Sequence, residues 1–491
     1  MEQIIKAFCA PGARREVECA APTLVVNVDQ YQKDVAVNSS VENVHTYTVL
    51  TKTRALDRWL DKVVEMSGSE PVFFIIIIAL LVWAFLGIPF GQSNDWQVGI
   101  SDAQAILNMI FDALLMRQQL NSYDSFIFVS ASLRSRTSSN RRMLKGLIES
   151  GKYEKVQPTQ FQDLQQTEFL SKLPVENWLG RISTIISSFV GHIATVFAFW
   201  VCIFIWIGFG QYCGWSTTWQ LYMNSASSAW MVFVLAFLAN ICEQHNNYTK
   251  KCLECIYEVD AALEIRLRTT TGDTIENETI LIPPPKRGRL QRAIDYYADL
   301  VGTLTGIVIL FLVMIVWVVI GPAMSFSANW WLLIGTYAGL VGLNDGLVLR
   351  NVQNILGGYE KAQFVQLIRD DQDMLALIGV TQLDEERVVD NSLSCRISVA
   401  VGNVCSHEMT VVLGAVLVVG LVVGASAMGW SVTGQLLCNV PPSIVKSFYM
   451  MILITGHNIA DAEKRVDLHN VYLRRLKLIS YVNTLVKLNE H

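Results

Sequence analysis

The chain contains 491 residues, of which 52% are hydrophobic and only 16% are charged. Soluble globular domains carry about 25% charged residues, so this composition excludes an ordinary soluble protein. The formal net charge of −5 is small for a chain of this length and gives no indication of a nucleic-acid partner. Apolar runs long enough to cross a bilayer recur along the sequence, which is typical of a polytopic membrane protein.

The N-terminal segment 1–53 is polar and lacks the apolar core of a signal peptide, so we expect the first membrane span to act as its own insertion signal. Eight apolar segments of spanning length follow this segment. In chain order, we predict spans near residues 71–90, 98–117, 193–209, 222–242, 303–320, 332–350, 409–427 and 443–459.

Basic residues divide the connections between these spans into two kinds. The connections without lysine or arginine are short, and they comprise residues 91–97, 210–221, 321–331 and 428–442. The remaining connections are long and basic. Since lysine and arginine are enriched on the cytoplasmic side of membrane proteins, both termini are predicted to be cytosolic and the four short hairpins to face outward.

The spans form pairs whose sequences resemble one another, which indicates an internal repeat. Trp83 and Trp96 of the first pair match Trp317 and Trp330 of the third pair at one offset. Because each pair begins and ends on the cytosolic side, the repeats are expected to be parallel and related by an axis along the membrane normal. Each copy opens with an amphipathic stretch that we expect to lie along the inner membrane interface.

These patterns predict an all-α polytopic membrane protein with eight transmembrane helices, arranged as four parallel two-helix repeats with cytosolic helical extensions. The repeats are expected at residues 54–150, 181–270, 292–375 and 396–480. A cytosolic linker at 271–291 separates the two halves, and residues 481–491 form a cytosolic tail. If the four pairs are arranged around the axis in the order of the sequence, the first pair faces the third pair across it.

Two acidic residues interrupt apolar spans at matching places in the repeat. Asp112 begins a six-residue motif that ends at Arg117, and Asp345 begins a similar motif that ends at Arg350. An acidic side chain in the middle of a transmembrane helix costs about 2.5–3.5 kcal/mol by the milder estimates, so it is a functional-site hypothesis by default. Two matched acids that approach each other across the axis favour a cation path. The structural alternative is a protonated aspartic acid that hydrogen-bonds a neighbouring helix.

Other oxygen and sulfur donors lie close to these acids in the sequence. Asn108 and Asp112 are four residues apart and therefore share a helical face. Asn344 adjoins Asp345, and Met116 lies one turn beyond Asp112. Carboxylate and amide oxygens with one softer sulfur suit a broad divalent-metal site better than a selective one.

Histidines and glutamates form a second candidate layer near the inner ends of the spans. Its members are His192, His245, His407, His457, Glu70 and Glu408. Imidazole and carboxylate are ordinary ligands for iron(II) or zinc. Amphipathic histidines that prefer the membrane interface are the structural alternative.

The outer side of the chain offers fewer candidates. Asp102 could line an entrance for cations, and Lys446, early in the eighth span, is a candidate partner for it. Cys213 and Cys438 are both expected near the outer face, where a disulfide is permitted. Whether these two cysteines pair is left open.

The paired spans, with the turns Trp96-Gln97 and Trp219-Gln220 between them, resemble the low-affinity iron permease family. The resemblance covers about residues 54–480 and is to the long fungal members. The chain departs from its own pattern at Trp331, where glutamine is expected, and at Gly434, where tryptophan is expected. The family provides no metal-ligand motif to transfer, so the candidate ligands above rest on their own chemistry.

This resemblance implies a plasma-membrane protein that is not an enzyme, has no permanently bound cofactor and transports iron(II). Zinc, copper and manganese are further candidate substrates, and a homo-oligomer in the lipid bilayer is left open. We expect low-affinity uptake driven by the metal gradient and by a membrane potential, which supplies about 4.6 kcal/mol per dication at 100 mV. The sequence contains no phosphate-binding glycine loop, which disfavours an ATP-driven pump.

A monovalent cation or proton channel that uses the same acids is the alternative function. Such a channel would have no need of the histidine and glutamate layer. A membrane-embedded di-metal oxidase is the enzyme alternative, but the spans contain no HxxxH or ExxH cluster.

Overall fold

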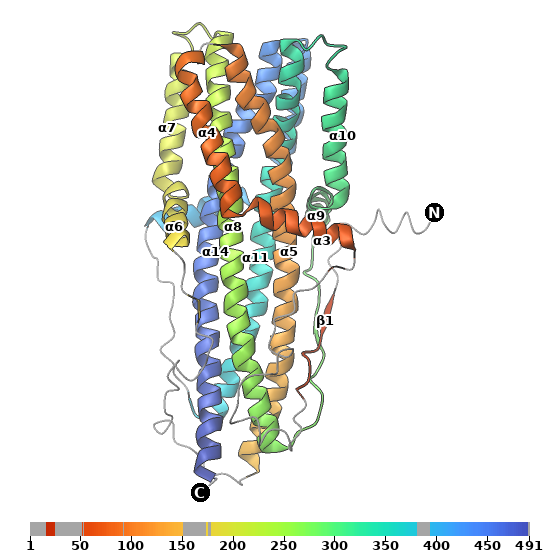
Figure 1. Ribbon diagram of the computed structural model, residues 1–491, viewed down its shortest axis with the longest axis vertical. Coiled ribbons are helices and arrows are strands. Elements are labelled where there is room, and N and C mark those ends of the chain that lie inside the picture. Colours follow the sequence, from red (N-terminus) through yellow and green to blue (C-terminus); the bar gives the residue numbers. More distant parts are fainter. Residues whose placement is uncertain are drawn as a thin grey trace, which may run out of the picture.

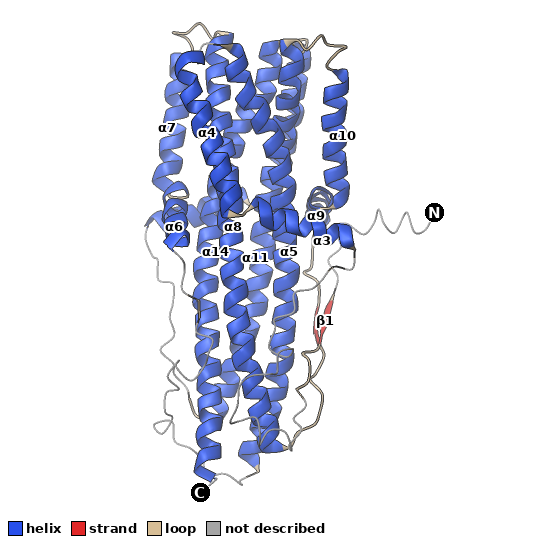
Figure 2. Cartoon of the chain, viewed as in Figure 1, coloured by secondary structure: helices blue, strands red, loops and turns tan. Residues whose placement is uncertain are grey.

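The chain is almost entirely helical, apart from one short two-stranded ribbon (Figure 2). The computed structural model describes residues 16–24, 52, 54–91, 93–150, 173–174, 178–380 and 393–489. Across these residues a short helix, an apolar helix and a long helix follow one another four times. In chain order these are α3 (Ala55–Ser67), α4 (Glu70–Phe90), α5 (Asn94–Glu149), α6 (Trp178–Val190), α7 (Ile193–Phe209), α8 (Thr217–Thr271), α9 (Arg289–Gly302), α10 (Leu304–Ile320), α11 (Ala328–Leu377), α12 (Leu393–Cys405), α13 (Glu408–Ala427) and α14 (Val432–Asn489).

The long helices α5, α8, α11 and α14 form the axis of the molecule (Figure 1). They contain 56, 55, 50 and 58 residues. At 1.5 Å per residue they are about 75–87 Å long, more than twice the thickness of a bilayer core. Only the half nearer the hairpin turns is flanked by apolar helices, and we call it the membrane half. The other half, beyond Arg117, His245, Arg350 and His457, is called the extension.

The apolar helices present their side chains outward. Neither α4 nor α10 contains a buried residue, and large side chains such as Phe85 and Ile88 are 68% and 82% exposed. An apolar surface of this extent is compatible with lipid and not with water. By length and composition, six of the described helices can cross a membrane, or eight if the bent pairs α6–α7 and α9–α10 each count as one span. The predicted polytopic, mainly helical membrane protein is therefore confirmed.

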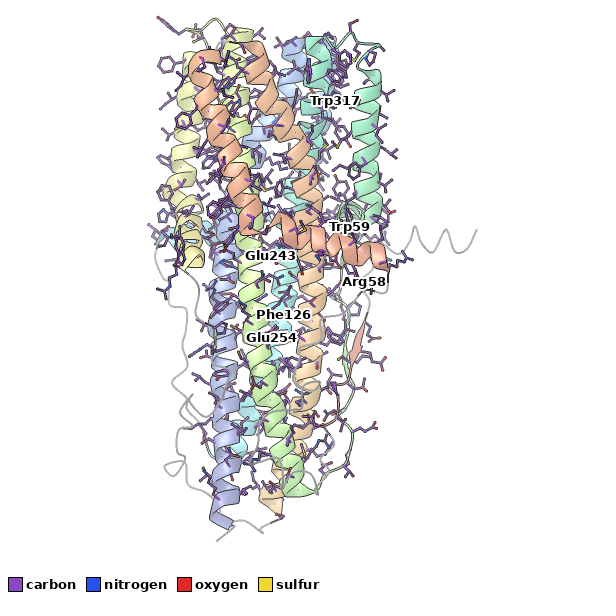
Figure 3. The ribbon with its side chains drawn as sticks, viewed as in Figure 1. Arg58, Trp59, Phe126, Glu243, Glu254 and Trp317 are labelled. Atoms are coloured by element: carbon purple, nitrogen blue, oxygen red, sulfur yellow. The ribbon has the colours of Figure 1, made fainter. Side chains whose placement is uncertain are left out.

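Stacked tryptophans join the two arms of three hairpins. The indoles of Trp83 and Trp96 stack with 4.3 Å between ring centroids, and each donates a hydrogen bond to the other's backbone carbonyl. Trp317 and Trp330 repeat this arrangement with centroids 4.5 Å apart. Trp317 lies near the hairpin end of the molecule, far from Trp59 on α3 (Figure 3). The fourth hairpin has Gly434 where the repeat pattern has tryptophan, so this position supplies no indole that could stack.

The order of the long helices around the bundle differs from the predicted ring. Helix α5 packs most extensively against α8 and α11, and α14 packs most extensively against the same two helices. The first hairpin is therefore beside the third and diagonal to the fourth, so the expectation that the first pair faces the third was wrong. Hydrophobic periodicity fixes which face of each helix is buried, but it does not fix which neighbour covers that face.

The extension has its own core, so the long helices do not separate after leaving the membrane half. Leu133, Ile256, Leu367 and Tyr472, one from each long helix, are buried together. The ribbon of β1 (Val17–Cys19) and β2 (Ile280–Ile282) pairs antiparallel and packs against α5.

Candidate functional site

A buried ion pair crosses the centre of the membrane half. The Nζ atom of Lys446 in α14 lies 2.5 Å from Oδ2 of Asp112 in α5, and both side chains are 2% exposed. Lys446 also donates to the amide oxygen of Asn108, one turn away in α5. The Asn108 amide in turn donates to the backbone carbonyl of Ala338 in α11 at 3.4 Å. Side chains and backbone from three long helices thus meet at one polar cluster.

The second predicted acid lies at the edge of the same cluster. The hydroxyl of Tyr297 in α9 donates to Oδ1 of Asp345 in α11 at 2.6 Å, and Asp345 is 5% exposed. Asp345 is also within electrostatic range of Asp112 and Lys446. The structure therefore places the two acids near each other on neighbouring helices, not across the axis as predicted, and gives each its own partner.

A glycine face on α11 makes room for this cluster. A β-carbon at Gly342 would collide with the Asn108 amide and would lie 3.1 Å from Nζ of Lys446. At Gly346 a β-carbon would lie 3.1 Å from Cε of Met450. Polar side chains from α5 and α14 consequently fill the space beside α11.

Unused hydrogen-bonding capacity remains in this region. Oδ1 of Asp112 is buried and has no hydrogen-bond partner among the described residues. Both carboxylate oxygens of Asp102 are likewise buried without a hydrogen-bond partner among the described residues, and that side chain is 7% exposed. Lys446 pairs with Asp112 and not with Asp102, so the partner suggested from the sequence was wrong.

The remaining donors near the acids are distributed differently. Met116 is fully buried in a hydrophobic cluster, where its sulfur packs among apolar side chains. Asn344 is half-buried beside Asp345. Arg117 binds Asp57 and Asp61 of α3 at 3.3 and 2.6 Å. Partial burial alone would raise the pKa of Asp61, but the nearby cations, Arg117 above all, hold that pKa below its usual value.

Two of the predicted histidines meet at the start of the extension. Nδ1 of His245 in α8 lies 3.0 Å from Nε2 of His457 in α14, and the two rings stack. The Asp461 carboxylate is 3.4 Å from His245 and is held by Arg465 at 2.5 Å. This group combines two imidazoles and a carboxylate just below the membrane half.

The other members of that layer occupy helix N-termini. His192 and His407 cap α7 and α13, each accepting a backbone hydrogen bond through Nδ1 at 3.2 Å. Glu70 and Glu408 are the first residues of α4 and α13, where a negative charge favours the helix dipole. Helix capping by the two histidines and the helix dipole at the two glutamates therefore account for the positions of all four side chains.

Glu70 also lines an opening between α3, α4 and α8. The cavity measures about 510 Å³ and includes Glu65, Glu243 and Asn247. Glu243 lies on α8 near the level of α3 (Figure 3). Gln118 of α5 donates to its carboxylate at 2.9 Å.

The comparisons with known proteins bear on this arrangement. The family model of the low affinity iron permease matches residues 179–262 and 394–490. A curated relative, the low-affinity iron/zinc ion transport protein of Schizosaccharomyces pombe, is 33% identical over 96% of this chain and 84% of its own length. This chain belongs to the low-affinity iron permease family. The low-affinity Fe(2+) transport protein of Saccharomyces cerevisiae is 31% identical to it over 98% of both chains.

No solved structure matches the permease. Its family and its curated relatives are transport proteins and not enzymes, as predicted. Within the described ranges, no group of three or more His, Cys, Asp or Glu side chains is placed to hold a metal ion. Cys213 and Cys438 are both free thiols, so the disulfide left open by the sequence is not formed.

Sequence reasoning missed Tyr297 and gave Lys446 the wrong partner. Tyr297 lies on an amphipathic helix where a tyrosine is unremarkable, and no sequence pattern connects it to Asp345. Lys446 could have been assigned, because a lysine inside an apolar segment requires a buried acid. Choosing Asp112 over Asp102 needed the helix order, which the sequence does not supply.

Proposed function

We propose that the permease mediates low-affinity uptake of iron(II), and of zinc and similar divalent metals, across the plasma membrane. The two relatives are named as an iron/zinc and an Fe(2+) transport protein, which supports these metals as substrates. The observation that carries the proposal is the burial of Asp112 and Asp345 in one cluster between the long helices. Two carboxylates can balance the two charges of a divalent cation.

We place both termini and the extension in the cytosol, with the four hairpin turns outside. The absence of lysine and arginine from these turns supports this orientation. The fourfold recurrence of a short, an apolar and a long helix supports four parallel hairpins, each preceded by an interfacial helix.

In this mechanism Lys446 occupies the cation position in the resting protein. An entering metal ion displaces the ammonium group from Asp112 and takes up the unused Oδ1 oxygen, while Asp345 and the Asn108 amide complete the protein contribution. Few protein ligands and a competing internal cation would both weaken binding. Low affinity follows from this competition.

The ion would then move toward the His245, His457 and Asp461 group. The closely packed extension blocks further passage along the axis, so we propose lateral exit through the opening lined by Glu65, Glu70 and Glu243. A membrane potential, negative inside, contributes about 4.6 kcal/mol per dication at 100 mV and favours inward movement.

The test is uptake of radiolabelled iron(II) and zinc in cells that lack their own low-affinity uptake. Asp112→Asn and Asp345→Asn should each lower the uptake rate at least about tenfold, because each removes a charge that balances the cation, worth about 1.4 kcal/mol or more. Glu254→Gln, on the exposed surface of the extension (Figure 3), is the matched control and should transport normally. Normal uptake by both aspartate variants at normal surface expression would refute the proposal.

A monovalent cation or proton channel remains the second candidate, since a buried lysine–aspartate pair can also exchange protons. His245→Asn and His457→Asn separate the two functions. Metal uptake should fall in these variants if the ion passes the histidine pair. An unchanged metal-independent current, with no metal uptake in the native protein, would favour the channel instead.

A further inference from the structure

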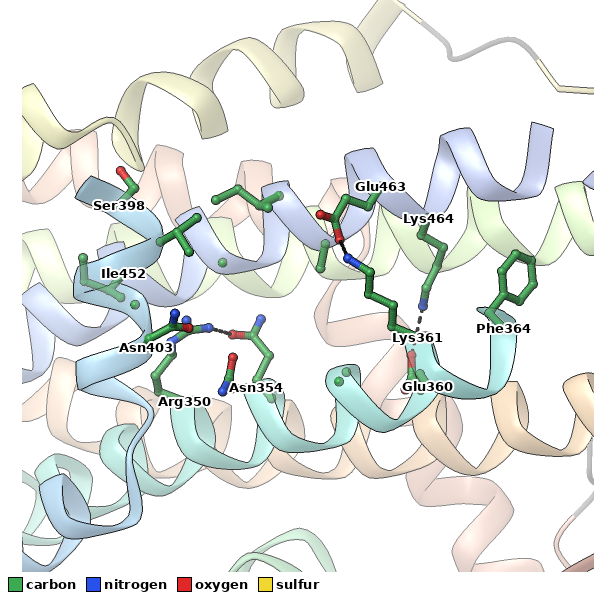
Figure 4. A pocket seen from close by; sticks show the side chains of 18 of the residues that line it. Arg350, Asn354, Glu360, Lys361, Phe364, Ser398, Asn403, Ile452, Glu463 and Lys464 are labelled. Carbon is green, nitrogen blue, oxygen red and sulfur yellow. Dashed lines mark hydrogen bonds and ion pairs between the residues drawn. The ribbon is translucent and has the colours of Figure 1, made fainter. Parts of the chain in front are cut away.

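A second, unassigned cavity lies between α11, α12 and α14, at the boundary of the membrane half and the extension (Figure 4). Its volume is about 270 Å³, enough for a small polar group and part of an apolar one. None of the residues proposed for metal transport lines it.

Arg350 is a buried cation at the end of this cavity nearer the membrane half, and no carboxylate in the described part of the chain pairs with it. Its side chain is 6% exposed, and Nη1 donates to Gln353 at 2.7 Å. Its Nε–H group is buried without a hydrogen-bond partner, and no carboxylate in the described ranges forms an ion pair with it. The matching Arg117 binds both Asp57 and Asp61. Because an unpaired buried charge is strongly unfavourable, an anion that binds beside Arg350 would offset a charge that the described residues leave uncompensated.

Neutral hydrogen-bonding groups surround this guanidinium. Asn354 of α11 and Asn403 of α12 lie on either side of Arg350, and Ser398 lies five residues before Asn403 on α12, farther from the guanidinium (Figure 4). Amide and hydroxyl groups can donate to oxygen atoms without adding charge. An oxyanion in this position would meet donors from two helices.

Two consecutive glycines keep the cavity open. Gly357 and Gly358 lie inside α11, where each glycine costs about 1 kcal/mol of helix stability relative to alanine. A β-carbon at either position would meet nothing within 4 Å. These glycines are therefore not required by close helix packing, and the space that they leave belongs to the cavity.

The charges at the far end of the cavity are already balanced. Lys361 binds Glu463 at 2.7 Å, and Lys464 binds Glu360 at 3.2 Å (Figure 4). These pairs join α11 to α14 and leave Arg350 as the group that selects the charge of a ligand.

The remaining side of the cavity adjoins lipid. Val399 of α12 lines the cavity and is 41% exposed, and α12 leads directly into the apolar helix α13. Val399 and Ile452 provide an apolar wall inside the cavity. A ligand that enters from this side must carry both an anionic head and an apolar body.

We propose that this cavity binds the phosphate group of an anionic phospholipid from the leaflet on the side of the extension. The guanidinium of Arg350 binds phosphate oxygens through paired hydrogen bonds, as arginine does at phosphate sites. The two asparagines and Ser398 donate to the remaining oxygens. The acyl chains leave the cavity past the exposed side chain of Val399.

The experiment uses the purified full chain in phosphatidylcholine micelles to which phosphatidylinositol or phosphatidylserine is added. Native mass spectrometry counts retained lipids, and the thermal unfolding midpoint gives the affinity. Arg350→Gln should lose one retained anionic lipid and bind about 10- to 100-fold more weakly, as expected for a lost charge-assisted hydrogen-bonding group. Arg396→Gln, at an exposed arginine of α12 that does not line the cavity, is the matched control and should bind like the native chain.

A second variant protects the test against a folding defect. Gly358→Leu fills the cavity, keeps Arg350 and should also weaken anionic lipid binding. In phosphatidylcholine alone, Arg350→Gln should be at least as stable as the native chain, because it removes an uncompensated charge. Equal lipid affinity in the native chain and both cavity variants would overturn the proposal. Equal stabilisation by inorganic phosphate without anionic lipid would overturn the assignment to a lipid.

Discussion

At the scale of single residues, the membrane half depends on the buried pair between Asp112 and Lys446. A charge pair in a low-dielectric interior costs desolvation energy that its mutual attraction only partly offsets, so such a pair is weak evidence for stability alone. Oδ1 of Asp112 is left without a partner in the described part of the chain. A pair that only fixed α5 to α14 would gain from using both oxygens, which favours exchange of the ammonium for another cation.

Variants of Lys446 distinguish a role of the ion pair in cation exchange from a role only in holding α5 to α14. Lys446→Met should lower the thermal stability of the purified protein, because removing one partner of a buried pair costs about 3–5 kcal/mol. The double variant Asp112→Asn/Lys446→Met removes both charges and should recover most of that stability. It should nevertheless transport no metal. A double variant that transports like the native protein would show that the pair has no part in the ion path.

At the scale of helices, the tryptophan turns and the glycines beside them determine how closely the arms of each hairpin pack. Gly87 in α4 faces Trp96 in α5, and a β-carbon there would lie 2.5 Å from the indole ring. Gly99 in α5 faces open space, with nothing within 4 Å of a β-carbon. The same residue type therefore has opposite roles on the two arms of one hairpin.

These two glycines make a matched pair of substitutions. Gly87→Ala should destabilise the first hairpin, because the methyl group must displace a stacked and hydrogen-bonded tryptophan. Gly99→Ala should leave stability unchanged or raise it by about 1 kcal/mol through helix propensity. Thermal unfolding of both variants in detergent measures the difference. If both substitutions stabilised the protein equally, the Trp83–Trp96 pair would not set the hairpin spacing.

The sequence predicted the spans, the short turns and the two acids because each depends on local composition. Each predicted span falls inside one helix of the structure, as 71–90 does in α4. Only the span 303–320 extends beyond its helix, by one residue at the start of α10. The neighbours of each helix could not be predicted in the same way. Asp345 met Tyr297, and Asp112 met Lys446, because of a helix order that no hydrophobic pattern encodes. The unpaired state of Arg350 also became visible only when its surroundings were known.

At the scale of the whole molecule, one continuous bundle connects the membrane half to the extension. The centre of the extension holds a buried charge network to which all four long helices contribute. Arg475 of α14 binds Asp260 of α8 and, at 2.8 Å, Asp371 of α11. Arg136 of α5 binds Glu264 of α8 at 2.8 Å. Since these side chains are buried, they fix the four helices in one register and block an axial path for ions.

Arg475 is the residue on which this network depends most. It binds two buried carboxylates, so Arg475→Met would leave Asp371 without this ion pair and Asp260 with Arg136 alone, at 3.5 Å. Removing such a partner costs about 3–5 kcal/mol, so the thermal midpoint and the expression level should both fall. Lys145→Gln, which removes an exposed pair with Glu149, should change stability by less than about 1 kcal/mol. An Arg475→Met protein as stable as Lys145→Gln would mean that the apolar core of the extension holds the four helices together without the network. In that case the buried charges would need a different explanation, such as coupling of the extension to the state of the membrane half.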